Sequence, residues 1–234
     1  MTVGLLQTSQ EALRLLFSGD TELWQIVWVS LKVSIVALLL ISPIAISAGY
    51  VLATQRFPGR RIIVVIVQAL FAFPTVVVGL LLYMLLSRQG LFGSLNLLFT
   101  QTAMMIGQML IAAPILVAFT LSAVQGSDAR IRETAMVLGA GRLRTALTVL
   151  REVRFGVMAA VFNGFGRVIS EVGCALMVGG NIAGMTRNMP TAIALETTKG
   201  EFAQGVALGI VLMVLALGVN FAMSWAQGAG EGHR

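Results

Sequence analysis

Residues 33–55 read VSIVALLLISPIAISAGYVLATQ, a run without a single Asp, Glu, Lys or Arg. Similar uncharged stretches lie at 62–87 and 202–230. About 20 apolar residues are enough for a helix to cross the roughly 30 Å hydrocarbon layer of a membrane. Charged residues make up 11% of the chain and hydrophobic residues 57%, whereas soluble domains carry about 25% charged residues. The sequence therefore predicts an integral membrane protein.

The uncharged runs lack the alternation of apolar and polar residues that a membrane strand shows. Backbone groups in lipid must bond within the protein, so helices are the remaining choice. We expect an all-α membrane protein with one domain over residues 1–234 and about five transmembrane helices. These spans are expected at 24–54, 62–86, 102–124, 155–178 and 202–225. Pro74 and Gly79 predict a kink or local unwinding in the second span.

Basic residues decide the expected orientation, because cytoplasmic connections are enriched in Lys and Arg. Most basic residues fall on the cytoplasmic side if the N-terminus lies outside. That side then holds Arg56, Arg60, Arg61, Arg130, Arg132, Arg142, Arg144, Arg151, Arg154 and Arg234, and the outer side holds Arg14, Arg88, Arg187 and Lys199. The net charge of +6 therefore fits contact with membrane lipid. No nucleic-acid-binding motif accompanies the charge, so we expect no nucleic-acid partner.

An arginine-rich segment between the third and fourth spans, residues 133–154, reads ETAMVLGAGRLRTALTVLREVR. Apolar residues recur at helical spacing on both sides of the glycines at 139–141. Glycine supplies the positive-φ geometry that ends a helix, so we expect a helix, a sharp turn and a second helix. The expected orientation places this loop, about residues 126–154, in the cytoplasm. It could lie on the membrane surface with its arginines toward headgroups, or dock a cytoplasmic partner.

The same segment resembles the EAA loop of ABC importer permeases. The pattern consists of Glu133, Ala135, Gly139 and Val149. In that family the loop fits a groove of a separate ATPase subunit and couples its movements to the membrane helices. The resemblance therefore implies an ATPase-coupling site. We add Arg142, which begins the second helix, to this expected site.

The resemblance extends from about residue 30 to residue 225. FPTVVVGL at 73–80 and SEVGCALMVGGNIAGMTRNMPTAIALETTKGEF at 170–202 look most like the oxyanion permeases, particularly the tungstate type. Thr134 replaces the second alanine of the EAA pattern, and VLRE at 149–152 stands where the family usually ends in proline. The first helix and its turn keep the pattern, whereas the end of the second helix is not defined by it.

The resemblance implies the permease subunit of a bacterial inner-membrane ABC importer. The expected substrate is an oxyanion, with tungstate first and molybdate or sulfate as alternatives. The expected partners are a cytoplasmic ATP-binding subunit, an extracytoplasmic oxyanion-binding protein and a second copy of this chain. An ion-coupled secondary transporter or a membrane scaffold that does not transport would be the other classes to consider.

No G-x-x-x-x-G-K-[ST] run occurs in the sequence, so we expect ATP hydrolysis in the separate subunit and no enzyme activity here. Cysteine and histidine show no metal-ligand spacing, and we expect no cofactor.

Arg167 and Glu171 are the charged residues expected inside the fourth span, four positions apart on one helix face. A charge at a helix centre in lipid costs at least about 2.5–3.5 kcal/mol, so such residues usually face a cavity or a partner helix. One hypothesis is that Arg167 attracts a passing oxyanion while Glu171 holds its guanidinium. The other is that the pair locks helix packing or a closed gate. We group the pair with Pro74 and Gly79 as the expected translocation path or gate.

Small and polar residues mark two other segments. Gly156, Ala160 and Gly164 recur every four positions in the fourth span, which permits close approach of another helix, although scattered small residues are common in apolar helices. Residues 179–200 form a polar connection in which Asn188 is a candidate cap and Pro190 lies in the first turn of a short helix. This connection is either a solvated linker or a surface that receives the binding protein.

Overall fold

The computed structural model describes residues 5–231, with side chains described for 7–225. Its helices are α1 (Leu5–Phe17), α2 (Thr21–Thr54), α3 (Arg60–Ala69), α4 (Thr75–Leu86), α5 (Gln101–Gln125), α6 (Ala129–Val137), α7 (Arg142–Glu152), α8 (Arg154–Ile169), α9 (Gly173–Gly179), α10 (Met189–Lys199) and α11 (Phe202–Glu231). Two short 3-10 turns, η1 (Leu70–Ala72) and η2 (Gly93–Leu95), complete the elements. No strand occurs within residues 5–231, so the all-α prediction is confirmed. Arg234, one of the residues used to assign orientation, lies outside the described residues.

Three helices, α2, α5 and α11, are long and apolar enough to cross a membrane. Two further pairs pass the same test together, α3 and η1 with α4, and α8 with α9. The number of candidate spans is therefore three, or up to five if each broken pair is one span. The prediction of about five transmembrane helices is confirmed in that form.

The second span is interrupted at Pro74, as the sequence predicts. Phe73 and Pro74 have extended backbone, with ψ of 128° and 120°, and α4 begins at the next residue. Proline has no N–H for an intrahelical bond, which favours an interruption at this point. Gly79 has a different role, because it lies inside α4 and a Cβ there would come 2.8 Å from the Cα of Cys174. Gly79 permits close packing and does not form the break.

The fourth span is also interrupted, which the sequence does not predict. Residues 170–172 separate α8 from α9. Arg167 lies in the last turn of α8, whereas Glu171 lies in the break. The expectation of one continuous helix carrying both residues is therefore wrong.

The chain packs as two compact units. Unit 1 comprises Met1–Ala37, Pro74–Ile111 and Gly166–Val219, and unit 2 comprises Leu38–Phe73, Ala112–Phe165 and Asn220–Arg234. Each of α2, α5, α8 and α11 contributes residues to both units. The single-domain organisation over residues 1–234 stays a prediction.

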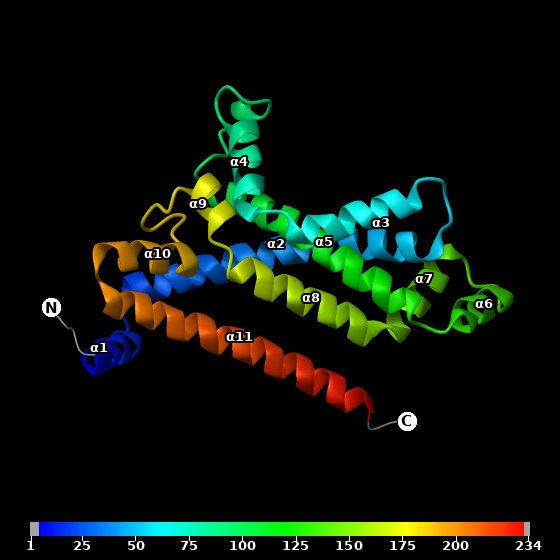
Figure 1. Cartoon of the computed structure of the whole chain (residues 1–234). Coiled ribbons are helices and arrows are strands. Elements are labelled where there is room, and N and C mark those ends of the chain that lie inside the picture. The colour runs from blue at the N-terminus through cyan, green and yellow to red at the C-terminus, as the bar shows by residue number, and fades with distance from the viewer. Residues whose placement is uncertain (1–4, 232–234) are drawn as a thin grey trace. The chain divides into compact units, whose positions relative to one another are not determined.

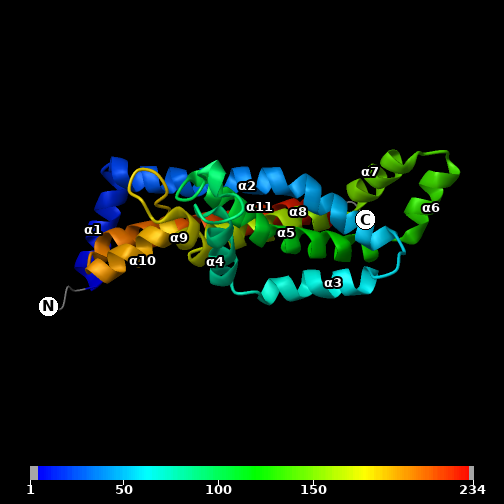
Figure 2. The same cartoon turned by 90° about the horizontal axis from the view of Figure 1, so that it is seen from above.

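In unit 1, α4 packs against α9, as Figures 1 and 2 both show. The predicted short helix is α10, and Asn188 caps it by accepting a hydrogen bond from the Thr191 backbone N–H at 3.1 Å. Pro190 lies in its first turn, as expected. The Met189 N–H donates to the Ser30 hydroxyl of α2 at 2.6 Å, which fixes the start of α10 to that helix.

In unit 2, α8 approaches α5 closely along the small residues that the sequence singles out. A Cβ on Gly156 would lie 2.5 Å from the Cβ of Ala123, and one on Gly164 would lie 2.7 Å from Leu116 Cδ1. Ala160, between these glycines, has no exposed surface. The predicted close helix contact is therefore confirmed for this stretch.

The turn between α6 and α7 supplies a test of the fold. Gly139 has a φ of +80° and Gly141 a φ of −65°, and a Cβ at either position would meet no atom within 4 Å. Gly139→Ser should reduce the free energy of unfolding of the hairpin by about 1–2 kcal/mol, because side chains disfavour the left-handed region. Gly141→Ser should change it by less than about 0.5 kcal/mol, because Gly141 is the N-cap of α7, where serine is well suited. Amide hydrogen exchange over 129–152 measures both, and equal effects would contradict the conformational explanation.

Candidate functional site

The α6–α7 hairpin in unit 2 begins with a capped helix. The Asp128 carboxylate accepts a hydrogen bond from the Arg130 N–H at 2.9 Å and so caps α6. Gly139 then turns the chain, and α7 starts after Gly141. Figure 2 shows the two short helices joined by this tight turn. The predicted helix–turn–helix is confirmed.

The predicted coupling residues divide into two groups within this hairpin. Ala135 and Val149 are only 9% and 3% exposed, and α6 packs against α7. Glu133, Gly139 and Arg142 are exposed. The buried pair therefore stabilises the hairpin, while the exposed residues are available to a partner.

Two arginine side chains, one from the hairpin and one from α3, bond to the end of α2, which sequence reasoning missed. Arg132 of α6 donates from Nη1 to the Thr54 carbonyl oxygen at 3.1 Å. Arg60 donates from Nε to the Leu52 carbonyl oxygen at 2.6 Å. The last carbonyls of a helix have no intrahelical partner, and basic side chains commonly satisfy them. Helix ends rich in nearby arginine were the available signal, although nothing in the sequence pairs these particular residues.

A groove of about 410 Å³ lies beside these bonds. Its lining includes Arg56, Arg60 and Arg132, together with Val149 of α7. The residue that ends the EAA pattern therefore lies beside the C-terminal end of α2, within the same unit. A displacement of the hairpin would act directly on this helix end.

In unit 1, Arg167 and Glu171 form the pair that the sequence predicts. Arg167 Nη1 lies 2.7 Å from Glu171 Oε2. The Glu171 side chain is 2% exposed and that of Arg167 is 40% exposed. Glu171 Oε1 accepts a second hydrogen bond, from the Cys174 N–H at 3.1 Å. Both carboxylate oxygens are thus engaged, whereas the guanidinium remains partly accessible.

Other polar side chains bond to backbone carbonyl oxygens around the break in the fourth span. The Ser170 hydroxyl donates to the carbonyl oxygens of Gly166 and Arg167, at 2.8 and 3.3 Å. The Gln108 side chain of α5 donates to the Val168 carbonyl oxygen at 3.3 Å. Gln108 is 3% exposed. Gln108 is a candidate functional residue that sequence reasoning missed. The one signal in the sequence was a glutamine within an apolar helix.

Packing around Cys174 brings Gly79 into the same region. A Cβ on Gly79 of α4 would lie 2.8 Å from Cys174 Cα, and one on Gly107 of α5 would lie 2.5 Å from Cys174 Sγ. The first turn of α9 is therefore held closely between α4 and α5. Pro74 lies one residue before α4, so all four predicted path residues belong to unit 1.

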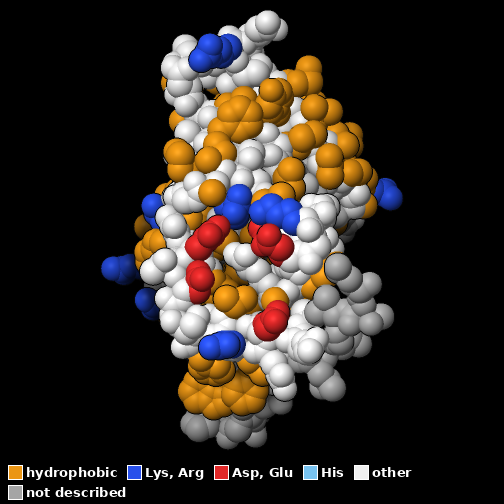
Figure 3. All heavy atoms as spheres, turned by 90° about the vertical axis from the view of Figure 1, so that its left-hand side faces the viewer, with side chains coloured by type: hydrophobic (Ala, Val, Ile, Leu, Met, Phe, Trp, Pro, Cys, Tyr) orange, Lys and Arg blue, Asp and Glu red, His pale blue; other side chains and the backbone are white. Residues whose placement is uncertain are grey.

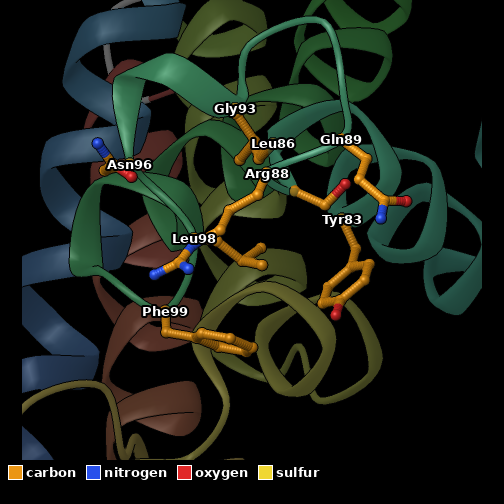
Figure 4. A pocket seen from close by; sticks show the side chains of 9 residues that line it. Tyr83, Leu86, Arg88, Gln89, Gly93, Asn96, Leu98 and Phe99 are labelled. Atoms are coloured by element: carbon orange, nitrogen blue, oxygen red, sulfur yellow. The ribbon is translucent and has the colours of Figure 1, made fainter.

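Hydrogen bonds hold the connection before α5 and the connection after α9 in place in unit 1. The Phe99 N–H donates to the Val178 carbonyl oxygen at 2.8 Å, and the Gln101 amide donates to the Met185 carbonyl oxygen at 2.7 Å. A cavity of about 650 Å³ opens at the end of α4 beside Phe99. Figure 4 shows the Arg88 side chain among the residues that line it, near Leu98.

Two further ion pairs occur among the described charged side chains of unit 1. Arg187 Nη1 lies 3.2 Å from Glu22 Oε1, 165 positions away in the chain. Lys199 Nζ lies 3.1 Å from Glu196 Oε1, three positions away on α10. Figure 3 shows acidic and basic side chains close together on the face that carries α1 and α10. Within the described residues, no group of three or more His, Cys, Asp or Glu side chains could hold a metal ion.

The sequence resembles known permeases over most of its length. A probable anion ABC transporter permease protein of Haloferax volcanii is 40% identical over 86% of this chain and 88% of its own. The tungstate uptake system permease protein TupB of Campylobacter jejuni is 38% identical over 91% of this chain and 89% of its own. The molybdenum transport system permease protein ModB of Escherichia coli is 29% identical over 83% and 89%.

The fold is found in a solved transporter as well. An inward-facing structure of the MetNI methionine ABC transporter has a chain that superposes with a TM-score of 0.71 at 17% identity, covering 91% of this chain and 98% of the other. This likeness concerns the fold alone. Residues 23–229 match the family described as binding-protein-dependent transport system inner membrane component. With several apolar helices and a match of that length, the chain belongs to this family and is a multi-pass permease of the inner membrane.

Proposed function

We propose that this chain is the translocation subunit of an ATP-driven importer for an oxyanion, with tungstate as the substrate. The observation that carries the choice of tungstate is the 38% identity to a tungstate uptake permease, against 29% to a molybdenum permease, at similar coverage. Molybdate or sulfate is the alternative. The proposed importer contains two copies of the chain, a cytoplasmic ATP-binding subunit and an extracytoplasmic binding protein.

In this arrangement the N-terminus lies outside, and the α6–α7 hairpin lies in the cytoplasm. The exposed Glu133 and Arg142 contact the ATP-binding subunit, while the buried Ala135 and Val149 keep the hairpin rigid. Arg132 transfers the movement to α2 through its bond to the Thr54 carbonyl. Rigid-body movement of packed elements is a common way to transmit such a signal.

The same orientation places the connection before α5 and the connection after α9 outside. Residues 87–100 and 180–188 would then form the surface that receives the binding protein. The bond from Phe99 to Val178 holds the first connection to α9, and the bond from Gln101 to Met185 holds the second connection to α5. Both bonds support a fixed surface and disfavour a loose linker. The anion would next meet Arg167, whose guanidinium is partly accessible and is oriented by Glu171.

The substrate assignment is tested on the purified complex in proteoliposomes. We expect the tungstate-loaded binding protein to stimulate ATP hydrolysis and ATP-dependent uptake more than the molybdate-loaded or sulfate-loaded forms. Uptake without ATP would contradict the importer and favour an ion-coupled carrier. A larger response to molybdate or sulfate would change the substrate and leave the importer in place.

Charge reversal at Glu133 tests the coupling surface. Because charged groups at an interface set register and partner choice, Glu133→Arg should reduce the ATP-binding subunit retained during purification about tenfold, or roughly 1.4 kcal/mol of binding. Glu11→Arg, an exposed glutamate of α1, is the matched control and should retain it fully. Equal retention by both variants would refute docking at the hairpin.

The two hypotheses for the buried pair are separated by a double substitution. Arg167→Gln leaves the Glu171 carboxylate buried without its cation and should destabilise the protein. Breaking a fully buried pair costs about 3–5 kcal/mol, and we expect a smaller effect here because Arg167 is partly exposed. Adding Glu171→Gln removes that charge and should restore the melting temperature. We expect the double variant to remain defective in anion uptake, because the attracting charge is missing. Recovery of wild-type uptake would assign the pair to bracing alone.

A further inference from the structure

The break in the fourth span leaves backbone carbonyl oxygens that need donors. In a continuous helix the Val168 carbonyl would accept from the amide four residues on. Here the Glu171 N–H donates to it at 3.2 Å, a tightened bond, and the Gln108 side chain donates to it at 3.3 Å. Val168 has no exposed surface, so water does not replace these donors within the unit. The Gln108 bond is therefore part of what keeps the helix interrupted.

The burial of Gln108 has an energetic cost. Its Oε1 has no hydrogen-bond partner among the described residues, and the side chain is 3% exposed. A buried acceptor without a partner destabilises a fold, whereas an apolar side chain of similar length would avoid that effect. The position of this amide is explained by the bond that it donates to Val168, 60 residues away in the chain.

We propose that Gln108 is a positioning residue for transport, which holds the fourth span broken beside the Arg167–Glu171 pair in one state of the cycle. When the span straightens, the turn around Val168 changes its position relative to α5, and the Val168 carbonyl moves out of reach of the Gln108 amide, which already donates over 3.3 Å. The bond thus stabilises the broken state alone and sets its population against the straight state. This inference rests on the proposed importer function.

Cys174 reports on the break without any further engineering. It is the single cysteine of the chain, 1% exposed, and lies three residues after Glu171, to which its N–H is bonded. Gly79 and Gly107 enclose it closely. A straightened or loosened span would disturb this enclosure, so the rate at which a maleimide labels Cys174 measures opening of the break.

The test compares Gln108→Met with Thr120→Val in the assembled complex. Methionine keeps the length of the side chain and removes the donor. Thr120 lies on the same helix, has no exposed surface, and its hydroxyl has no partner among the described residues, so valine removes no bond. Loss of one hydrogen bond should lower the ratio of broken to straight state about fivefold. We expect a several-fold rise in Cys174 labelling and in ATP hydrolysis without binding protein, with fewer anions imported per ATP.

Two results would overturn the proposal, and two controls accompany them. Unchanged labelling in Gln108→Met relative to Thr120→Val overturns it. Faster labelling with an unchanged number of anions per ATP also overturns it, because the bond would then be structural only. A melting temperature equal to that of wild type shows that the variant is folded. If the wild-type complex imports no anion, the proposed function fails, while the labelling comparison still decides whether Gln108 holds the break.

Discussion

Carbonyl oxygens that a helix end leaves without an intrahelical partner need other donors, and side chains from distant helices supply them in both units. In unit 1 the Val168 carbonyl is reached by Gln108. In unit 2 the Leu52 and Thr54 carbonyls at the end of α2 are reached by Arg60 and Arg132. Lipid offers no substitute for the Gln108 bond, so the fourth span can stop within the membrane only where such a donor is placed. The end of α2 lies instead beside the groove that the arginines line. Interruptions and their donors therefore have to be considered together.

The Arg167–Glu171 pair is also held in place by a backbone group. Glu171 uses one oxygen for Arg167 and the other for the Cys174 N–H, so the carboxylate is fixed by the start of α9 as well as by the guanidinium. Its side chain is 2% exposed, against 40% for Arg167. Burial of the guanidinium as well would add a desolvation cost. The asymmetry leaves the positive end accessible, as the proposed anion path requires.

The sequence predicts what depends on local chemistry. The hairpin of α6 and α7 follows from the glycines at 139–141 and the helical spacing on both sides of them. The interruption at Pro74 is favoured by a missing N–H, although Pro43 and Pro114 lie inside continuous helices. The break at 170–172 escapes prediction because neither proline nor glycine occurs there. Its stabilising partner Gln108 lies 60 residues away, and Arg132 lies 78 residues from Thr54. No periodicity or spacing rule connects positions so far apart, so these contacts require the fold.

Rigidity of the α6–α7 hairpin is useful for coupling only if the hairpin is also attached to a membrane helix. The bond from Arg132 to the Thr54 carbonyl and the packing of Val149 beside the same groove provide this attachment within unit 2. A hairpin joined to the spans by its two connections alone would rotate about them, and its movement would be lost. A guanidinium bonded to a helix terminus resists that rotation, because moving α6 would leave the carbonyl without its donor. In the proposed coupling role, the EAA pattern supplies both exposed and buried residues of the hairpin, and Arg132 with the end of α2, which the pattern does not include, supplies its attachment.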